Sequence, residues 1–564
     1  MHDLVIRGAR VVDGTGAPAT VADVAVDGSV IVAVEPDAGS ARQVIEGDGL
    51  LLTPGWVDVH THYDGQVTWD PEVTPSSWHG VTTVVMGNCG VGFAPVRPDG
   101  HDFLIELMEG VEDIPGTALH EGIDWQWESF PEYLDALEAT PRVMDIAAQV
   151  PHAALRAYVM GDRAHDDATV DDVRQMAELT YEALMAGAVG VTTSRTILHR
   201  SKHGLVPGTY APADELLAIG DAIGRAGHGV FQLITDRPQG DDERTLMTEL
   251  ARRNDATVSY SLSQVPYDRE GYREALHDAD RLDAAGLRVM PQVPTRPTGM
   301  LFGLESSLHP FISHPTYRTV ADLPVAARAR RLADPEIRRR LLDDQPGTSN
   351  AIALALMSRW EQIFPLGDPP DYEPARETSA AGVAAREGRR PEEVVLDWLL
   401  ERDGRALLFA PLASYADFDH EAILEMMTHP RTVLGLGDGG AHCGLICDAS
   451  MATFLLTHWV RDRTRGRRIP VEQAVHLQTG RTARAYGFGD RGTIEPGKRA
   501  DLNLVDLDGM VLHAPEMVFD LPAHGRRLVQ RVDGYKATMV AGTVTYRDGE
   551  PTGERPGRLI RAGR

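Results

Sequence analysis

Short apolar runs alternate with helix-like stretches through the middle of the chain. Helical periodicity is visible over Asp171–Ala186 and Ala213–Ala226, between runs that have the length and apolar character of buried strands. Strands that alternate with helices are typical of parallel βα units, and eight such units close into a barrel. The pattern therefore predicts an α/β protein built on a (β/α)8 TIM barrel. The eight predicted strands end near His62, Cys89, His152, Ser194, Thr235, Gln264, Thr295 and Asp438.

The two ends of the chain carry a different pattern, in which short β-like runs are divided by Gly and Asp. Near the start, Val21–Val26 and Val30–Val34 flank Asp27-Gly28, a sequence typical of a hairpin turn. Runs of the same kind return near the end, as at Ala500–Asp506. We therefore expect both ends to pair into one flanking β-sandwich beside the barrel. The expected domains are residues 1–52 and 490–564 for the sandwich and 53–489 for the barrel.

The stretch before the last predicted strand is too long for a single helix. Residues from about 300 to 430 are rich in Arg and Leu and show helical periodicity over Ala326–Asp344 and Ser349–Phe364. The sequence predicts a helical insertion within the barrel domain. This insertion is expected either to cover the barrel mouth or to make a subunit contact, and the pattern does not distinguish the two.

The composition limits which partners and which cellular location we expect. The 564-residue chain has a formal net charge of −28, whereas nucleic acids and anionic membranes bind basic surfaces. No apolar run reaches roughly 18 residues, the length of a membrane span, and the first residues do not resemble a secretory signal. Only three cysteines occur, too few for a disulfide framework. We therefore expect a cytoplasmic protein that acts on a small molecule and binds neither nucleic acid nor membrane.

His60 and His62 follow the apolar run Pro54–Val59. Side chains alternate along a strand with a period of two, so both imidazoles point to the same face. Two histidines on one face at a strand end form half of a metal site. The alternative is a pair of polar residues that cap the strand.

Cys89 and Asp438 end two further predicted strands. A thiolate at Cys89 is a soft metal ligand, although a lone cysteine in an apolar strand is more often a small core residue. Asp438 can bind a metal and act as a general base toward a water, although Asp-Gly is also a common turn. At one end of a barrel with His60 and His62, both positions favour the metal interpretation.

Several motifs together resemble the amidohydrolase superfamily and, through the cysteine at the second strand, its D-aminoacylase (N-acyl-D-amino acid deacylase) branch. The resemblance covers most of the chain. It implies a (β/α)8 barrel with a flanking β-sandwich from both chain ends, and hydrolysis of amide or other C–N bonds with zinc. The motifs are Pro54–His62, Gly87–Gly90, Pro151–Arg156, Gly187–Ser194, Asp438-Gly439 and Gly497–Leu502.

The resemblance also implies roles for individual residues. His60 and His62 resemble the paired ligands of the first strand, and Cys89 resembles the thiolate ligand. Asp438 resembles the eighth-strand ligand that also moves the proton. His152 matches a histidine of the branch that we expect in contacts with substrate or around the metal ligands.

The chain departs from the branch at the fifth and sixth strands. Where the branch has a histidine in a His-x-Arg context, this chain has Gln232, and Ile234 takes the place of the arginine. Where the branch has Ser-His-x-Lys, this chain reads Ser261-Leu262-Ser263-Gln264. Glutamine is a poor zinc ligand and leucine is none. The sequence therefore predicts a single-metal set, which suits zinc and which copper also accepts.

The predicted function is that of a metal-dependent amidohydrolase, with Asp438 as its catalytic residue. Its substrate is a small amide, either an N-acyl amino acid or a cyclic amide. The candidate substrate contacts are His152, Arg195, Arg296 and His442. The two arginines follow strand ends and can bind an anionic group. The alternatives are non-amide chemistry at a single soft-ligand metal and a barrel that binds a small molecule without catalysis. The resemblance leaves a homo-oligomer open.

Overall fold

Parallel strands form the centre of the molecule, and helices pack around them. The computed structural model describes residues 1–563 and contains all eight predicted strands. They lie in two sheets, β6-β7-β8 and β19-β15-β14-β13-β10-β9, in which every ladder is parallel. The bounds are β6 Trp56–Asp58, β7 Val81–Met86, β8 Asp145–Ala148, β9 Val150–Pro151, β10 Gly190–Arg195, β13 Val230–Thr235, β14 Thr257–Ser261, β15 Val289–Val293 and β19 Val433–Leu434.

Backbone hydrogen bonds join the two sheets at both junctions. Thr61 and Gly439 form a parallel bridge beyond the ends of β6 and β19, and the His62 amide donates to the Gly439 carbonyl at 2.8 Å. On the other side, the Val189 amide donates to the Ala148 carbonyl at 3.0 Å. Because one residue alone separates β8 from β9, the two form one interrupted third strand. The predicted α/β class is therefore confirmed.

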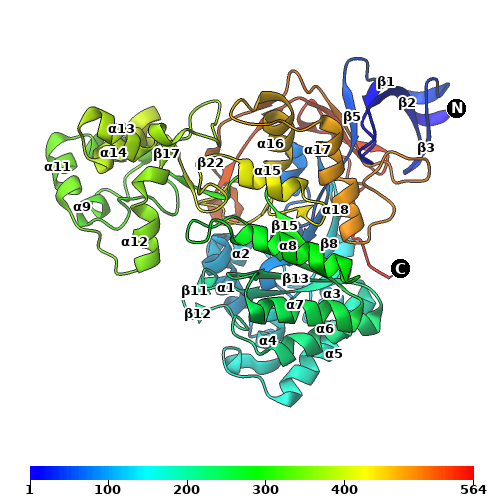
Figure 1. Cartoon of the computed structure of the whole chain (residues 1–564), viewed down its shortest axis with the longest axis horizontal. Coiled ribbons are helices and arrows are strands. Elements are labelled where there is room, and N and C mark those ends of the chain that lie inside the picture. Colours follow the sequence, from blue (N-terminus) through cyan, green and yellow to red (C-terminus); the bar gives the residue numbers. More distant parts are fainter. Residues whose placement is uncertain (564) are drawn as a thin grey trace.

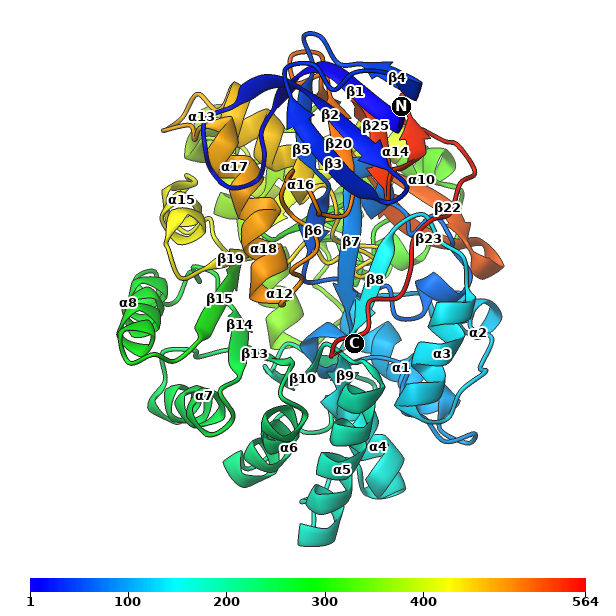
Figure 2. The ribbon, with the colours of Figure 1, turned by 90° about the vertical axis from the view of Figure 1, so that its right-hand side faces the viewer.

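Helices cover the outer side of these strands, as Figure 2 shows for α4 to α8. Helix α5 begins at a capping box formed by Thr169 and Asp172 and ends at Gly187, whose φ of 120° suits a residue without a Cβ. The helices predicted at Asp171–Ala186 and Ala213–Ala226 are confirmed to within one residue. The helices outside the lobe described below are α1 His101–Glu112, α2 Gly116–Gly122, α3 Phe130–Ala139, α4 His152–Met160, α5 Val170–Ala186, α6 Ala213–Ala226, α7 Asp241–Asn254, α8 Gly271–Ala284, α15 Glu421–Thr428, α16 Met451–Phe454, α17 Val471–Gln478 and α18 Gly480–Ala485.

The two chain ends pair in one nine-stranded sheet, as their common pattern predicted. Strand β5 from the N-terminal part lies antiparallel to β20 from the C-terminal part, with Leu502 opposite Pro54. The expected hairpin turn forms at Gly28, with φ +58°. The strands are β1 His2–Val11, β2 Thr20–Asp27, β3 Val30–Glu35, β4 Ala41–Glu46, β5 Leu51–Pro54, β20 Leu502–Val505, β25 Tyr535–Val540, β26 Thr543–Arg547 and β27 Glu550–Pro551.

The predicted insertion contains a helical lobe, which projects to one side of the molecule in Figure 1. It has its own apolar core, in which Phe302, Leu332 and Leu399 are fully buried. The lobe comprises α9 Pro315–Arg318, α10 Val325–Leu332, α11 Pro335–Asp343, α12 Ala351–Met357, α13 Ala380–Glu387 and α14 Pro391–Gly404, with β16 Gly299–Phe302, β17 Phe364–Pro365 and β18 Leu408–Pro411.

Both long helical runs expected in the insertion are shorter in the structure. The helical structure expected over Ala326–Asp344 is present but divided into α10 and α11, because Asp334 caps a new helix that starts at the following proline. The helical structure expected over Ser349–Phe364 is confirmed only for α12, which ends before Ser358, and a short turn leads from there into β17.

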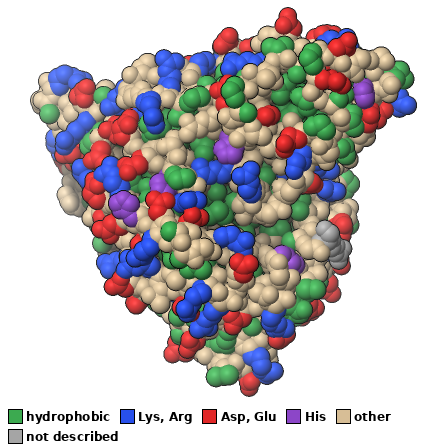
Figure 3. All heavy atoms as spheres, turned by 45° about the vertical axis from the view of Figure 1, so that its right-hand side comes forward, with side chains coloured by type: hydrophobic (Ala, Val, Ile, Leu, Met, Phe, Trp, Pro, Cys, Tyr) green, Lys and Arg blue, Asp and Glu red, His purple; other side chains and the backbone are tan. Residues whose placement is uncertain are grey.

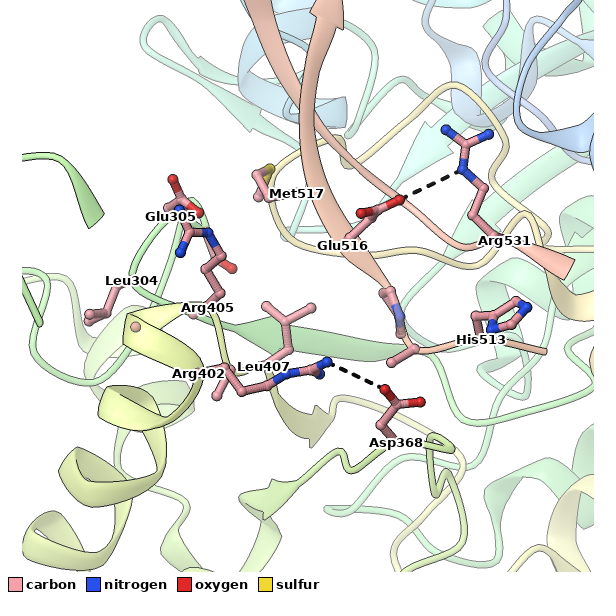
Figure 4. Close-up of a pocket in the computed structure, with 16 residues that line it drawn as sticks. Leu304, Glu305, Asp368, Arg402, Arg405, Leu407, His513, Glu516, Met517 and Arg531 are labelled. Atoms are coloured by element: carbon pink, nitrogen blue, oxygen red, sulfur yellow. Dashed lines mark hydrogen bonds and ion pairs between the residues drawn. The ribbon is translucent and has the colours of Figure 1, made fainter. Parts of the chain in front are cut away.

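A cavity of about 660 Å³ lies between this lobe and the C-terminal segment. Figure 4 shows its charged lining, in which Arg402 pairs with Asp368 and Arg531 pairs with Glu516. Part of β22 contributes to its C-terminal wall. The remaining short strands are β11 Arg200–Ser201, β12 Gly204–Leu205, β21 Val511–Leu512, β22 Glu516–Leu521, β23 Gly525–Val529 and β24 Val532–Asp533.

The surface mixes charges of both signs. On the face drawn in Figure 3, acidic and basic side chains are interspersed over most of the area. Within residues 1–563, no helix combines the length and the apolar content that crossing a bilayer requires.

A buried ion cluster connects β8 with the segment that leads into β20. Asp145 is fully buried, and its two carboxylate oxygens pair with Arg491 at 2.8 Å and with Arg499 at 2.9 Å. It also accepts the backbone amide of Arg558 at 2.8 Å. This carboxylate therefore holds three points of the C-terminal part against a central strand.

We predict that Asp145→Asn lowers the free energy of unfolding by about 3 kcal/mol, because two buried guanidinium groups lose one of their carboxylates and keep only the longer contacts with Asp501 inside the cluster. Urea denaturation followed by circular dichroism measures the change. The control is Asp135→Asn, since the Asp135 side chain is exposed where it pairs with Arg561. Equal stability of the two variants would contradict a dominant role for the buried cluster.

Candidate metal centre

His60, His62 and Cys89 converge at the ends of two neighbouring strands. Their ligand atoms all lie within 4.8 Å of one another, and the three side chains are buried. The Cys89 Sγ is 3.3 Å from the His60 Nε2. Asp438, which follows β19, places its Oδ1 3.5 Å from the His60 Nε2 and 3.9 Å from the His62 Nε2. The structure thus brings together the four residues that the sequence predicted as ligands.

Unusual backbone conformations direct these side chains. Cys89, Asp438 and His442 are non-glycine residues with φ of 57°, 45° and 53°, in the left-handed region. Such residues concentrate at functional sites, where the surrounding structure holds them against a local energetic cost. Gly87 leads into Cys89 with φ +82°, and a Cβ there would lie 2.3 Å from the Gln149 carbonyl oxygen. The turn before Cys89 therefore requires glycine.

Two glutamines orient the ligands His60 and Cys89 through hydrogen bonds. The His60 Nδ1 lies 2.6 Å from the Gln292 Oε1, which can only accept a hydrogen bond. The proton of His60 is therefore on Nδ1, and the Nε2 lone pair faces Cys89 and Asp438. The Gln232 Oε1 accepts the Cys89 backbone amide at 3.1 Å. Gln232 stands where the D-aminoacylase branch has a histidine ligand. In this chain it instead orients another ligand, Cys89.

The other substituted positions are absorbed into packing. Leu262 is 2% exposed and belongs to the central apolar core. Gln264, in place of the lysine, accepts the Ala416 amide at 3.1 Å and donates to Asp417 at 2.7 Å. These contacts attach the end of the sixth strand to the loop that follows β18.

The donor set fits a soft divalent cation. Burial lowers the pKa of His60 to about 4 and that of His62 well below its usual value, so both imidazoles are neutral and have a lone pair to donate. Burial and the nearby Glu112 and Asp438 carboxylates raise the pKa of the Cys89 thiol well above its usual range. A cation among these groups would relieve the repulsion between them and hold the thiolate form.

Glu112 is a member of this site that the sequence analysis missed. It is the last residue of α1 and is 1% exposed. Its Oε1 lies 3.5 Å from the His62 Nδ1, and its Oε2 lies 3.5 Å from the His442 Nε2. The Glu112 Oε1 and the His62 Nδ1 are both buried without a hydrogen bond. The sequence offered only an acidic residue near the end of an amphipathic helix, which usually indicates a solvated face.

Two candidate substrate residues are histidines with different surroundings. His442 lies at the edge of the site, with 23% of its side chain exposed. His152 is buried and bonds through both ring nitrogens, to the Thr193 hydroxyl at 2.9 Å and to the Glu215 carboxylate at 2.8 Å. The substrate roles of both residues stay predictions, and His442 has the more accessible position.

The two candidate arginines are held by carboxylates. Arg195 pairs with Glu243 at 2.6 Å, and Arg296 pairs with Asp448 at 3.0 Å. Arg296 is also fully buried and lies over the ring of Tyr372. Their contacts with substrate stay predictions as well.

The loop that carries His442 is bonded to the base of the insertion. The Leu301 amide donates to the Leu445 carbonyl at 2.7 Å, and the Ser307 amide donates to the Gly444 carbonyl at 2.9 Å. Part of the insertion therefore lies beside the candidate site. This agrees with the expectation that the insertion covers the barrel mouth.

A small cavity of about 20 Å³ borders Asp438. Asp448 and Arg527 also line it, among apolar residues such as Ile446 and Leu528. This volume is enough for about one water molecule. Asp438 therefore has room for a water at its side.

Comparison with known proteins identifies the family. The model of the amidohydrolase family matches residues 43–546. The chain is 29% identical to the N-acyl-D-aspartate deacylase of Alcaligenes xylosoxydans xylosoxydans, over 100% of this chain and 95% of that protein. A solved D-aminoacylase with a binuclear metal centre superposes with a TM-score of 0.67 at 24% identity, with 100% of both chains covered.

A second solved structure has the same fold. The N-acyl-D-glutamate deacylase of Bordetella bronchiseptica, in complex with zinc and a phosphonate inhibitor, gives a TM-score of 0.65 at 24% identity over 100% of both chains. The resemblance to the D-aminoacylase branch is confirmed by these matches. Because the family model covers most of its length, this chain belongs to the amidohydrolase family.

Proposed function

We propose that this chain is a metal-dependent amidohydrolase that cleaves the amide C–N bond of a small N-acyl amino acid. The observation that carries the proposal is the meeting of two imidazoles, a thiol and a carboxylate at adjoining strand ends. Family membership supports the class of reaction, and similarity to an N-acyl-D-aspartate deacylase supports the class of substrate.

The proposal includes the complete architecture. The two parallel sheets close as one (β/α)8 barrel over residues 53–489, and residues 1–52 and 490–563 form the β-sandwich. The last residue of the predicted sandwich domain, 564, lies outside the described residues. The bridge between Thr61 and Gly439 supports closure of the barrel. A cytoplasmic location and a homo-oligomer stay predictions from composition and resemblance.

One divalent transition metal, zinc or alternatively copper, is the proposed cofactor. His60, His62, Cys89 and Asp438 would hold it, because neutral imidazoles and a thiolate are ligands that such metals prefer. When bound, the metal supplies a Lewis acid for the substrate carbonyl and lowers the pKa of a water.

Asp438 is the proposed proton carrier. Its carboxylate lies near both imidazoles. Burial alone raises the pKa of Asp438 to about 7, and a cation bound beside the carboxylate would lower that value. It accepts the proton of the attacking water and returns it to the leaving nitrogen, so that the amine departs as a neutral group. His442, partly exposed at the edge of the site, contacts the substrate.

The surroundings of the sixth strand and of the two arginines favour a cyclic amide as a second candidate substrate. Gln264 is bonded to Asp417, and the guanidinium groups of Arg195 and Arg296 are already paired with carboxylates. In this arrangement neither guanidinium offers a free positive charge to a substrate carboxylate, and Gln264 is uncharged. A cyclic amide such as a hydantoin or an imide does not require such a contact.

We expect alanine at both His60 and His62 to remove one metal atom per chain relative to wild type, because these residues supply two of the four proposed ligands. Elemental mass spectrometry of the purified proteins measures the loss. Loss of two atoms would show a binuclear centre and contradict the single-metal proposal. An unchanged metal content would favour a barrel without a catalytic metal.

Asp438→Asn should lower turnover by about 10²- to 10⁴-fold while the protein stays folded, since the amide cannot accept the proton of the water. The assay measures product release from N-acyl-D-amino acids, N-acyl-L-amino acids and cyclic amides, and so also decides between the two candidate substrates. Asp214→Asn, an exposed change on α6, is the control and should retain turnover. Full activity of Asp438→Asn would exclude the proposed proton carrier.

Glu112→Gln should weaken metal binding by about 10- to 100-fold, because a carboxylate beside the second nitrogen of a histidine ligand orients the ring and raises its basicity. Competition with a chromogenic chelator measures the affinity. Glu109→Gln, an exposed neighbour on α1, should bind metal as wild type does. If both variants bind equally well, Glu112 does not support His62.

A further inference from the structure

A second group of ligand atoms lies away from the proposed catalytic centre. The Glu373, His420 and His458 side chains each offer one ligand atom, and the three atoms all lie within 4.8 Å of one another. Glu373 lies in the loop between β17 and α13, and His420 directly precedes α15. His458 lies in a π-helix, Leu455–Asp462, a rare element that is frequent at functional sites.

The hydrogen bonds of His420 fix its tautomer. Its Nε2 lies 2.9 Å from the Tyr372 carbonyl oxygen, which can only accept, so the proton is on Nε2. The Nδ1 therefore carries a lone pair. It is buried without a hydrogen bond and lies 3.7 Å from the Glu373 Oε2. Two electron-rich atoms thus face each other in the interior with nothing donated between them.

His458 completes the arrangement from the other side. Its Nε2 lies 3.1 Å from the same Glu373 Oε2 and is also buried without a hydrogen bond. The His458 ring is stacked on Phe454, with centroids 4.5 Å apart and an angle of 13° between the planes. About 17% of the side chain is exposed, which leaves a route from solvent to the group.

Arg463 pairs with Glu373 but does not satisfy the whole group. Its Nη2 donates to the Glu373 Oε1 at 2.9 Å and to the Glu421 Oε1 at 2.9 Å, so one guanidinium is shared by two carboxylates. Its Nε also donates to the Glu373 Oε2, at 3.1 Å. An ion pair explains these contacts, but it leaves the lone pair of His420 without a partner in the interior, which is unfavourable.

We propose that Glu373, His420 and His458 form a second metal site, which takes a divalent transition metal such as zinc. Two imidazole nitrogens and one carboxylate oxygen are a ligand set that zinc accepts, and a water would fill the remaining position. The site would join three segments, namely the loop between β17 and α13, the start of α15 and the π-helix. Its role is to hold the insertion against the barrel rather than to act on substrate.

Cobalt substitution tests the site, because Co²⁺ bound by a thiolate has a charge-transfer band that a site without cysteine lacks. The metal-free protein is loaded with Co²⁺, and bound atoms per chain are counted together with the absorption spectrum. We expect His458→Gln to bind one Co²⁺ fewer than wild type and to keep the thiolate band of Cys89. The control, His476→Gln, alters a half-buried histidine of α17 and should match wild type.

The two metal sites give separate results in this experiment. A missing thiolate band would contradict the proposed catalytic centre, while a difference of one Co²⁺ between wild type and His458→Gln would still support the second site. Equal Co²⁺ content in wild type and His458→Gln would overturn the second site.

A measurement on the wild-type protein avoids any dependence on how the variant folds. Diethyl pyrocarbonate modifies accessible histidines, and mass spectrometry locates the modified residues. Because 17% of the His458 side chain is exposed while its Nε2 is buried, we expect slow modification without metal and a lower rate after Co²⁺ loading. Equal modification in both states would overturn the proposal.

Discussion

The pairing of the first strand with the last determines where chemistry can occur in this protein. Beyond the ends of β6 and β19, the Asp438 amide donates to the His60 carbonyl at 3.0 Å, and the His62 amide donates to the Gly439 carbonyl at 2.8 Å. These bonds hold residues from distant parts of the sequence in one register. The side chains of His60, His62 and Asp438 meet because their backbones are bonded to each other.

Burial then makes the charged forms of the groups at this site energetically costly. Carboxylates at Glu112 and Asp438 share a closed interior with the thiol of Cys89. Burial and the repulsion between these groups raise the pKa of Cys89 and of Glu112 well above their usual values. An uncompensated group of this kind is costly to bury, and a bound cation is the simplest compensation. The left-handed backbone at Cys89 and Asp438 adds local strain that the surrounding strands must hold.

Amide side chains support the ligands where charged groups would add to this cost. Gln232 on the fifth strand holds the backbone of Cys89, and Gln292 on the next strand but one fixes the tautomer of His60. An amide oxygen is well suited to this task because it accepts a hydrogen bond without adding charge to a buried site. The proposed single-metal centre therefore depends on neutral residues that orient its ligands as much as on the ligands themselves.

Sequence patterns were enough to predict the order of strands and helices, the pairing of the chain ends and the identity of the residues at the strand ends. Periodicity reports these features because it reflects which side of each element is buried. It did not reveal Glu112, nor the grouping of Glu373, His420 and His458, because helices and loops far apart in the chain bring these residues together. These contacts depend on how α1 and the insertion pack against the central strands, which no local pattern in the sequence reports.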